Sequence, residues 1–178
     1  MRDASAEGNV DEIKSLLFSG LLDIDCGTGC YKETALFAAT NQGHKHVVQF
    51  LLDRGANPSE ADGLGYTPLH MAVGGNNSLQ PFVADLVKLL LGFGADPNMA
   101  AEWGTTKGTT PLHVVVSYGS KYMRGREDVV QLLMSKGADP EKANEIGETP
   151  LSMAHKMGLM NIVNILNCYE EQQTISSQ

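Results

Sequence analysis

Apolar residues recur along this chain with the spacing of helices that bury one face. The i, i+3, i+4 pattern occurs at Val87, Leu90 and Leu91 and again at Val130, Leu133 and Met134. Glycines follow three runs of this kind, at Gly55, Gly94 and Gly137, and glycine readily takes the left-handed conformation that ends a helix. Segments rich in turn formers separate the runs, so the pattern predicts pairs of short helices joined by turns.

Four segments of the chain start in the same way, with the letters TALF, TPLH, TPLH and TPLS. Their first residues are Thr34, Thr67, Thr110 and Thr149, which are 33, 43 and 39 residues apart. A threonine fits the N-cap of a helix, where its hydroxyl accepts a hydrogen bond from a free backbone N–H, and a proline fits the first turn. The later parts VVQFLLDRGANP, LVKLLLGFGADP and VVQLLMSKGADP are also alike, so each segment begins a repeated unit of two helices.

This pattern resembles that of ankyrin repeat proteins, whose unit of about 33 residues carries a T-P-L-H-x-A start. The resemblance covers nearly the whole chain and implies an all-α solenoid of stacked helix-turn-helix units with short β-hairpin loops, called fingers. We expect one domain over residues 1–169 and a frayed polar tail over residues 170–178. The repeats are expected at about residues 1–25, 32–64, 65–107, 108–146 and 147–169, the first and last acting as caps. The first repeat lacks an upstream finger, which leaves open that the chain is part of a longer protein.

The charge of the chain excludes several classes of partner. Its 178 residues include 21 acidic and 13 basic side chains, a formal net charge of −8, whereas nucleic acids and anionic membranes attract basic surfaces. No apolar run approaches the roughly 18 residues of a membrane-spanning helix. The cysteines Cys26, Cys30 and Cys168 show no C-x-x-C spacing and are expected to be reduced thiols. The composition therefore predicts a monomeric, soluble, intracellular protein, either cytoplasmic or nuclear.

The sequence contains none of the common motifs for catalysis, such as a Walker loop, G-x-S-x-G or H-E-x-x-H. We therefore expect no enzyme activity, no cofactor and no metal. His70 and His113 occupy the same repeat position, where a hydrogen bond to the neighbouring repeat is favoured over metal binding or catalysis.

A zinc site formed by Cys26 and Cys30 together with His44 or His46 is one hypothesis for these side chains. Their spacing matches no usual zinc pattern. A role in capping the second helix is favoured for both histidines, which flank Lys45 at the turn between the two helices of a repeat.

Ankyrin repeat proteins bind partners through the finger tips and the exposed face of the first helix of each repeat. The resemblance therefore implies a non-catalytic module that binds a peptide or a protein. Carried over one repeat at a time, it places partner contacts at Glu33, Asn41, Gln42, Asp62, Leu64, Tyr66, Glu102, Trp103, Ser117, Tyr118, Glu145, Ile146 and Glu148. The third repeat has Gly74 and Gly75 late in its first helix, where other repeats have larger side chains. Two other roles stay open: a regulatory or substrate-recruiting domain of a larger enzyme, such as a ubiquitin ligase, or an inhibitor that masks a segment of a transcription factor.

The predicted fingers hold the excess of negative charge. Residues 21–33, 56–66, 95–109 and 138–148 carry eleven acidic and three basic side chains, a difference equal to the net charge of −8. Either these fingers are simply solvated, or their charge attracts a basic segment of the partner. Trp103 lies on the third finger, which is four residues longer than its neighbours, and it either anchors the partner or packs against the next finger.

The third and fourth repeats each carry six extra residues between their two helices, in GGNNSLQPF and SYGSKYMRGRE. Adjacent repeats stack, so we expect the two extensions side by side at the helix ends away from the fingers. One hypothesis is a second binding surface formed by Phe82, Lys121, Tyr122, Met123, Arg124 and Arg126. The other is that Phe82 and Tyr122 pack together and lengthen the helices.

Overall fold

Ten helices make up most of the described part of the chain. The computed structural model describes residues 1–18, 23–74, 82–102, 107–119 and 126–176. The helices are α1 (Arg2–Ala6), α2 (Val10–Phe18), α3 (Ala35–Asn41), α4 (Lys45–Leu52), α5 (Pro68–Gly74), α6 (Val83–Gly92), α7 (Pro111–Gly119), α8 (Glu127–Ser135), α9 (Pro150–Lys156) and α10 (Met160–Ser176).

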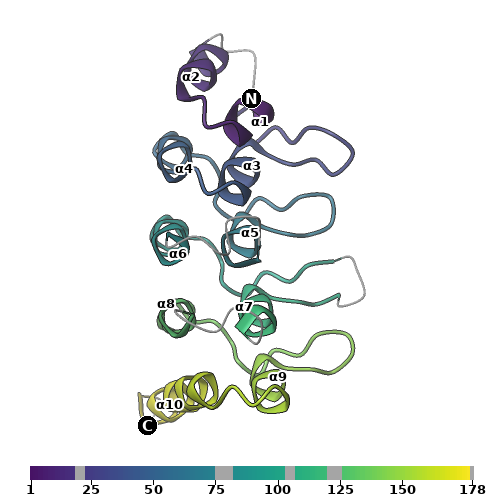
Figure 1. The fold of residues 1–178 in the computed structure, drawn as a ribbon, viewed down its shortest axis with the longest axis vertical. Coiled ribbons are helices and arrows are strands. Elements are labelled where there is room, and N and C mark those ends of the chain that lie inside the picture. The colour runs from purple at the N-terminus through teal and green to yellow at the C-terminus, as the bar shows by residue number, and fades with distance from the viewer. Residues whose placement is uncertain (19–22, 75–81, 103–106, 120–125, 177–178) are drawn as a thin grey trace.

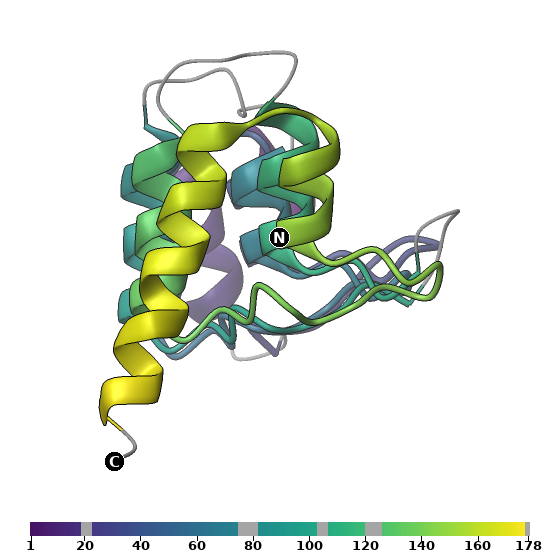
Figure 2. The same ribbon diagram turned by 90° about the horizontal axis from the view of Figure 1, so that it is seen from below.

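The helices stack in two adjacent columns. Figure 1 shows α1, α3, α5, α7 and α9 in one column and α2, α4, α6, α8 and α10 in the other. Seen along the stack in Figure 2, the fingers that join one helix pair to the next project to the same side of the columns. This arrangement is the all-α solenoid that the repeated sequence predicts.

Threonine hydroxyls begin the first helix of the repeats, as the sequence predicts. The Thr34 hydroxyl accepts a hydrogen bond from Phe37 N at 3.1 Å. Thr149 accepts one from Ser152 N at 3.0 Å, and the Ser152 hydroxyl in turn accepts one from Thr149 N, which completes a capping box. These bonds satisfy backbone amides that have no partner within the helix.

Glycine follows the second helix of the three central repeats, and the last helix has no such stop. Gly55, Gly94 and Gly137 have φ angles of 87°, 90° and 82°, in the left-handed region that glycine tolerates. In contrast, α10 continues to Ser176, through most of the segment expected to be a frayed tail. Residues 160–176 contain no glycine or proline, and the glutamates and glutamines there favour a helix, so the backbone stays helical.

The fingers reverse the chain like hairpins, but the described residues contain no strand. A single isolated bridge joins Thr28 and Glu33 there. Other fingers are closed by one or two backbone hydrogen bonds, such as Asp62 N to Tyr66 O at 2.9 Å, and neighbouring fingers are joined by bonds such as Glu102 N to Leu64 O at 2.9 Å. These few bonds close short hairpin-like fingers without a longer ladder, which agrees with the predicted solenoid with short fingers.

Apolar side chains of adjacent helix pairs form one core along the stack. Leu69, Leu86 and Leu112 are each at most 1% exposed. The core extends through all the helix pairs, because each pair covers the apolar faces of the pair before it. It places the first helices in one rigid row, with the fingers at their N-terminal ends.

Candidate partner-binding surface

Two buried histidines connect neighbouring repeats at the base of the fingers. His70 Nδ1 accepts a hydrogen bond from Thr67 N at 3.1 Å, so the neutral ring carries its proton on Nε2, which is 3.0 Å from the Thr109 carbonyl oxygen of the next repeat. His113 bonds in the same way to the amide of its own threonine and to Glu148 O, the latter at 3.0 Å. The predicted hydrogen bond between repeats is confirmed, and both ring nitrogens of each histidine are engaged.

Burial keeps both of these histidines uncharged. It lowers the pKa of His70 to about 4, although the Thr109 carbonyl acts in the opposite direction. Burial lowers the pKa of His113 as well. At neutral pH both rings are therefore neutral and serve as hydrogen-bonding groups of the fold.

His44 and His46 do not cap the second helix of their repeat as predicted. His44 occupies the N-cap position of α4, yet its side chain makes no cap bond. Its Nε2 lies 2.9 Å from the Ala6 carbonyl oxygen, and His46 Nε2 lies 3.3 Å from that of Gly8, both in the preceding repeat. The rings reach the turn of the preceding repeat instead of their own helix, so these histidines connect repeats too. Within the described ranges, no three His, Cys, Asp or Glu side chains gather as ligands for a metal.

Two hollows lie in the corner between the first helices and the fingers. The larger, which we call the central hollow, has about 350 Å³ and extends over α5, α7 and α9. Among the predicted contacts it brings together Tyr66, Ser117, Tyr118 and Glu148. The smaller has about 190 Å³, lies beside α1 and α3, and is lined in part by Glu33, Asn41 and Gln42. Several positions chosen from the repeat pattern thus line the same two hollows.

Three apolar residues of the central hollow are not among the predicted partner contacts. Met71, Val114 and Met153 lie four residues after the threonine that begins each of three successive repeats, and all three are half-buried. We call this set the apolar row. An alignment of the repeats could have predicted the apolar row, because equivalent residues of stacked helices face the same way.

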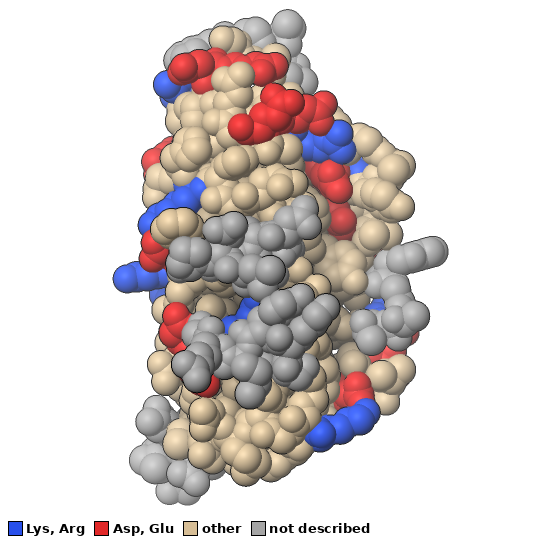
Figure 3. All heavy atoms as spheres, in the orientation of Figure 1, with Lys and Arg blue, Asp and Glu red and all other residues tan. Residues whose placement is uncertain are grey.

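Several predicted acidic contacts have basic partners in the structure. The ion pairs are Glu33 with Arg2 at 3.1 Å, Glu145 with Lys107 at 2.8 Å and Glu148 with Lys156 at 2.8 Å. The two pairs with an exposed lysine, Glu145 with Lys107 and Glu148 with Lys156, contribute little stability. Glu102 is exposed on the third finger. On the face shown in Figure 3, acidic side chains gather towards the upper, N-terminal end of the stack.

Asp62 takes part in the structure of its own finger. Its Oδ1 accepts hydrogen bonds from Leu64 N at 2.9 Å and from Tyr66 N at 2.8 Å. Burial raises the pKa of the Asp62 carboxyl group above its usual range. Leu64 is half-buried, whereas Ile146 on the last finger is 60% exposed. Trp103 lies outside the described residues.

The hypothesis of a second surface concerns mainly residues outside the described part of the chain, namely Lys121, Tyr122, Met123 and Arg124. Phe82 is described and is 53% exposed. Arg126 does not fit the hypothesis, because it is buried and its Nη1 donates a hydrogen bond to Val73 O at 2.6 Å. The last carbonyl groups of a helix accept no hydrogen bond within the helix and carry partial negative charge. They therefore attract this guanidinium.

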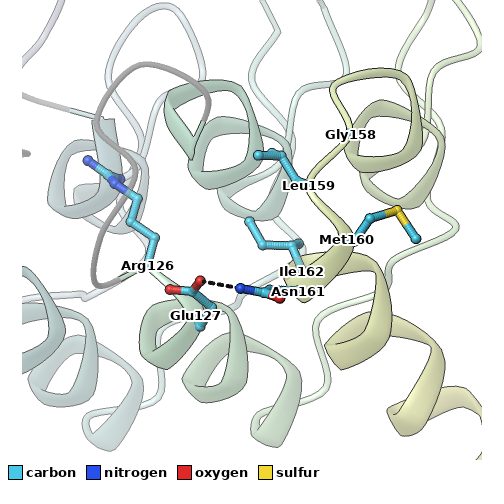
Figure 4. A pocket seen from close by; sticks show the side chains of 7 residues that line it. All are labelled: Arg126, Glu127, Gly158, Leu159, Met160, Asn161 and Ile162. Atoms are coloured by element: carbon cyan, nitrogen blue, oxygen red, sulfur yellow. Dashed lines mark hydrogen bonds between the residues drawn. The ribbon is translucent and has the colours of Figure 1, made fainter.

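A third hollow, of about 220 Å³, lies where α8 and α10 begin (Figure 4). Asn161 Nδ2 donates a hydrogen bond to Glu127 Oε1 there at 3.4 Å, and Met160 is 55% exposed. The Arg126 side chain points away from Glu127 in Figure 4. Apart from Arg126, none of the residues around this hollow is a predicted partner contact.

Stacked pairs of short helices with fingers on one side define a repeat solenoid. The model of the family described as ankyrin repeats (3 copies) matches residues 1–83 and 78–176. The chain therefore belongs to the ankyrin repeat family. Ankyrin repeats are generally protein–protein interaction modules, and their fold is a non-catalytic one. In the part of the chain that the structure describes, no helix combines the length and apolar character needed to cross a membrane.

Curated relatives resemble parts of this chain. An ankyrin repeat protein of Rickettsia bellii is 35% identical over 74 residues, which are 42% of this chain and 27% of that protein. The human transient receptor potential cation channel subfamily A member 1 is 32% identical over 104 residues, 58% of this chain and 9% of the channel. The ankyrin repeat, SAM and basic leucine zipper domain-containing protein 1 of Saimiri boliviensis boliviensis is 37% identical over 100 residues, 56% of this chain and 20% of that protein. The chain thus covers less than a third of the length of each of these relatives.

Proposed function

We propose that this protein binds an extended segment of a partner protein in the corner between the first helices and the fingers. The central hollow supports this most directly, because Tyr66, Tyr118 and Glu148 of three successive repeats surround one space of about 350 Å³. Because the core of the stack is continuous, few of its side chains need to become ordered on binding. The loss of conformational entropy therefore offsets little of the interaction energy.

The partner segment is proposed to carry net positive charge. The fingers hold eleven acidic against three basic side chains, and a field of this sign attracts a basic chain before contact. Local ion pairs such as Glu148 with Lys156 reduce the charge at single points but leave the sum unchanged. We therefore expect the charge to speed association more than it strengthens the final contact.

Replacement of two tyrosines tests the surface. The partner is first cross-linked to the whole chain in cell lysate and identified, and its affinity for purified variants is then measured by calorimetry. The double variant Tyr66→Ala, Tyr118→Ala is expected to bind at least roughly tenfold more weakly, since aromatic side chains at the centre of an interface carry much of its energy. Gln131→Ala on the exposed side of α8 is the control and should bind like the wild type. Equal affinities of the two variants would contradict the proposal.

Salt tests the charge of the partner segment. Raising the ionic strength from about 0.1 M to about 1 M shortens the screening length from roughly 10 Å to 3 Å. The association rate in stopped-flow mixing should fall at least roughly tenfold, with a smaller change in the dissociation rate. An association rate that salt does not change would remove the basic segment from the proposal and leave the binding surface in place.

A further inference from the structure

The apolar row of Met71, Val114 and Met153 lines the central hollow on three successive first helices. All three side chains are partly exposed to solvent. Ala38 holds the equivalent position in α3 and is small and buried, so the row begins at α5. When a partner covers neighbouring apolar side chains that were in contact with water, the burial of their surface stabilises the complex.

Several polar groups around the row already have hydrogen-bonding partners within the protein. Both nitrogens of His70 and of His113 are engaged, and Ser117 Oγ donates to His113 O at 2.9 Å. Asn144 Oδ1 accepts from two amides of its finger. A polar ligand would have to break such bonds to make its own, which cancels much of the gain. The chemistry of the hollow therefore favours an apolar occupant.

The aromatic side chains beside the row are in contact with neighbouring side chains. The Tyr66 ring meets the His70 ring edge-on, with centroids 5.6 Å apart. The Arg126 guanidinium lies 5.7 Å from the centre of the Tyr118 ring. Side chains that are held in place before binding lose little conformational entropy when a ligand enters.

We infer that the apolar row anchors one apolar side chain, of the leucine, methionine or phenylalanine class, that projects from an extended and net basic protein segment. Charge complementarity selects the segment, because the three fingers beside the hollow, residues 56–66, 95–109 and 138–148, carry eight acidic and two basic side chains. A volume of about 350 Å³ is at the small end of natural ligand pockets and suits a side chain better than a folded element. This inference rests on the proposed function and adds to it the chemistry of the central contact.

Displayed peptides supply the probe for this contact. A library of short random peptides is selected on the immobilised full chain, and the enriched peptides are synthesised and titrated. We expect them to share an apolar residue among basic ones, and its replacement by alanine to weaken binding at least roughly tenfold. In a chain labelled with ¹³C at the methionine methyl groups, the Met71 and Met153 signals should shift on binding, and the Met160 signal of the third hollow should not.

Matched substitutions separate the anchor from the rest of the surface. Met71→Gln keeps the length of the side chain but makes its end polar, so peptide binding is expected to weaken at least roughly tenfold. Met160→Gln makes the same change at an exposed site outside the central hollow and should leave binding unchanged. If Met71→Gln prevents folding, Met153→Gln tests the other end of the row.

Four results would overturn the inference, and they differ in whether the proposed function survives. Peptides that bind the wild type and Met71→Gln equally, or that shift Met160 instead of Met71, overturn the anchor but not the proposed function. Enriched peptides that share no apolar residue would likewise overturn the anchor but not the proposed function. If no peptide is enriched over a bare surface, the proposed binding of extended segments fails together with the anchor.

Discussion

At the scale of single residues, two fingers are each organised at their base by one side-chain oxygen that accepts two backbone hydrogen bonds. Asp62 Oδ1 accepts hydrogen bonds from Leu64 N and Tyr66 N. Asn144 Oδ1 accepts bonds from the amides at the equivalent places in the last finger, at 3.1 and 2.9 Å. An amide oxygen and a carboxylate oxygen thus perform the same task, so the charge of Asp62 is separable from its structural role.

Two substitutions of Asp62 test this separation. Asp62→Asn keeps the accepting oxygen and removes a carboxyl group whose pKa is raised by burial, so the free energy of unfolding at neutral pH should stay within about 0.5 kcal/mol or rise slightly. Asp62→Ala leaves two amides without their acceptor and should cost about 1–3 kcal/mol. Urea unfolding measures both. A loss in Asp62→Asn as large as in Asp62→Ala would show that the charge itself is required.

At the scale of helices, α5 and α6 both end in glycine but in different surroundings. A Cβ atom at Gly74 would stand 2.5 Å from Val114 Cγ1 of α7, whereas one at Gly92 would meet nothing within 4 Å. The first helices of the third and fourth repeats therefore pack more closely at Gly74 than a side chain there permits. Packing between helices, and not helix propensity, makes one glycine necessary and the other replaceable.

The same substitution at the two glycines should have opposite effects. Gly74→Ala forces Val114 or its helix to move and is expected to lower the free energy of unfolding by about 1–3 kcal/mol. Gly92→Ala restricts the unfolded chain and favours the helix, so it should raise the stability by up to about 1 kcal/mol. Paired thermal and urea unfolding curves provide the measurement. A stabilised Gly74→Ala variant would mean that the helices adjust at no cost.

At the scale of the whole molecule, contacts between neighbouring repeats hold the stack together, and the buried histidines belong to this series. His70 joins the third repeat to the fourth, and His113 joins the fourth to the fifth. Protonation of Nδ1 in His70 would break the bond from Thr67 N and place a charge in a buried site. The stability of the stack should then depend on pH where free histidine titrates.

The sign of this dependence follows from the pKa of His70, which is about 4 in the fold against 6.5 for an unperturbed histidine. The unfolded chain takes up the proton first, so the stability is complete above pH 6.5 and is lost as the pH falls from 6.5 towards 4. The loss should reach about 1.4 kcal/mol per pH unit for this group. Urea unfolding at about pH 7.5 and about pH 5 measures it, and His70→Gln should reduce the slope. Equal slopes in variant and wild type would assign the pH dependence to other groups.

Features that depend on nearby residues could be predicted well. The start of a helix at Thr34 and its end before Gly55 follow from hydrogen bonds and backbone angles within a few residues. The bond from His70 to the next repeat could be predicted because the same residue returns as His113 in the same setting. Prediction failed for Arg126, since a polar extension gives no sign that its guanidinium meets a carbonyl of the preceding repeat.

The candidate site could be predicted in part, for a related reason. Repeat positions led to Tyr66 and Tyr118, which do meet around the central hollow. Within the described residues the fingers reverse the chain as the predicted short hairpins do, closed by one or two backbone bonds each and with one isolated bridge between Thr28 and Glu33. The pairing of Glu148 with Lys156 joins a finger to a helix end and has no signature in either segment alone.

The order of apolar, turn-forming and capping residues was enough to specify the repeat and the pairing of its helices. Each of these depends on interactions inside one unit or between similar neighbours, and such interactions recur with the sequence. The meeting of Met71, Val114 and Met153 around one hollow, and the burial of Arg126 against Val73, emerge only in the folded stack. They join residues far apart in the chain, in repeats of unequal length, and their distances depend on how closely those repeats pack.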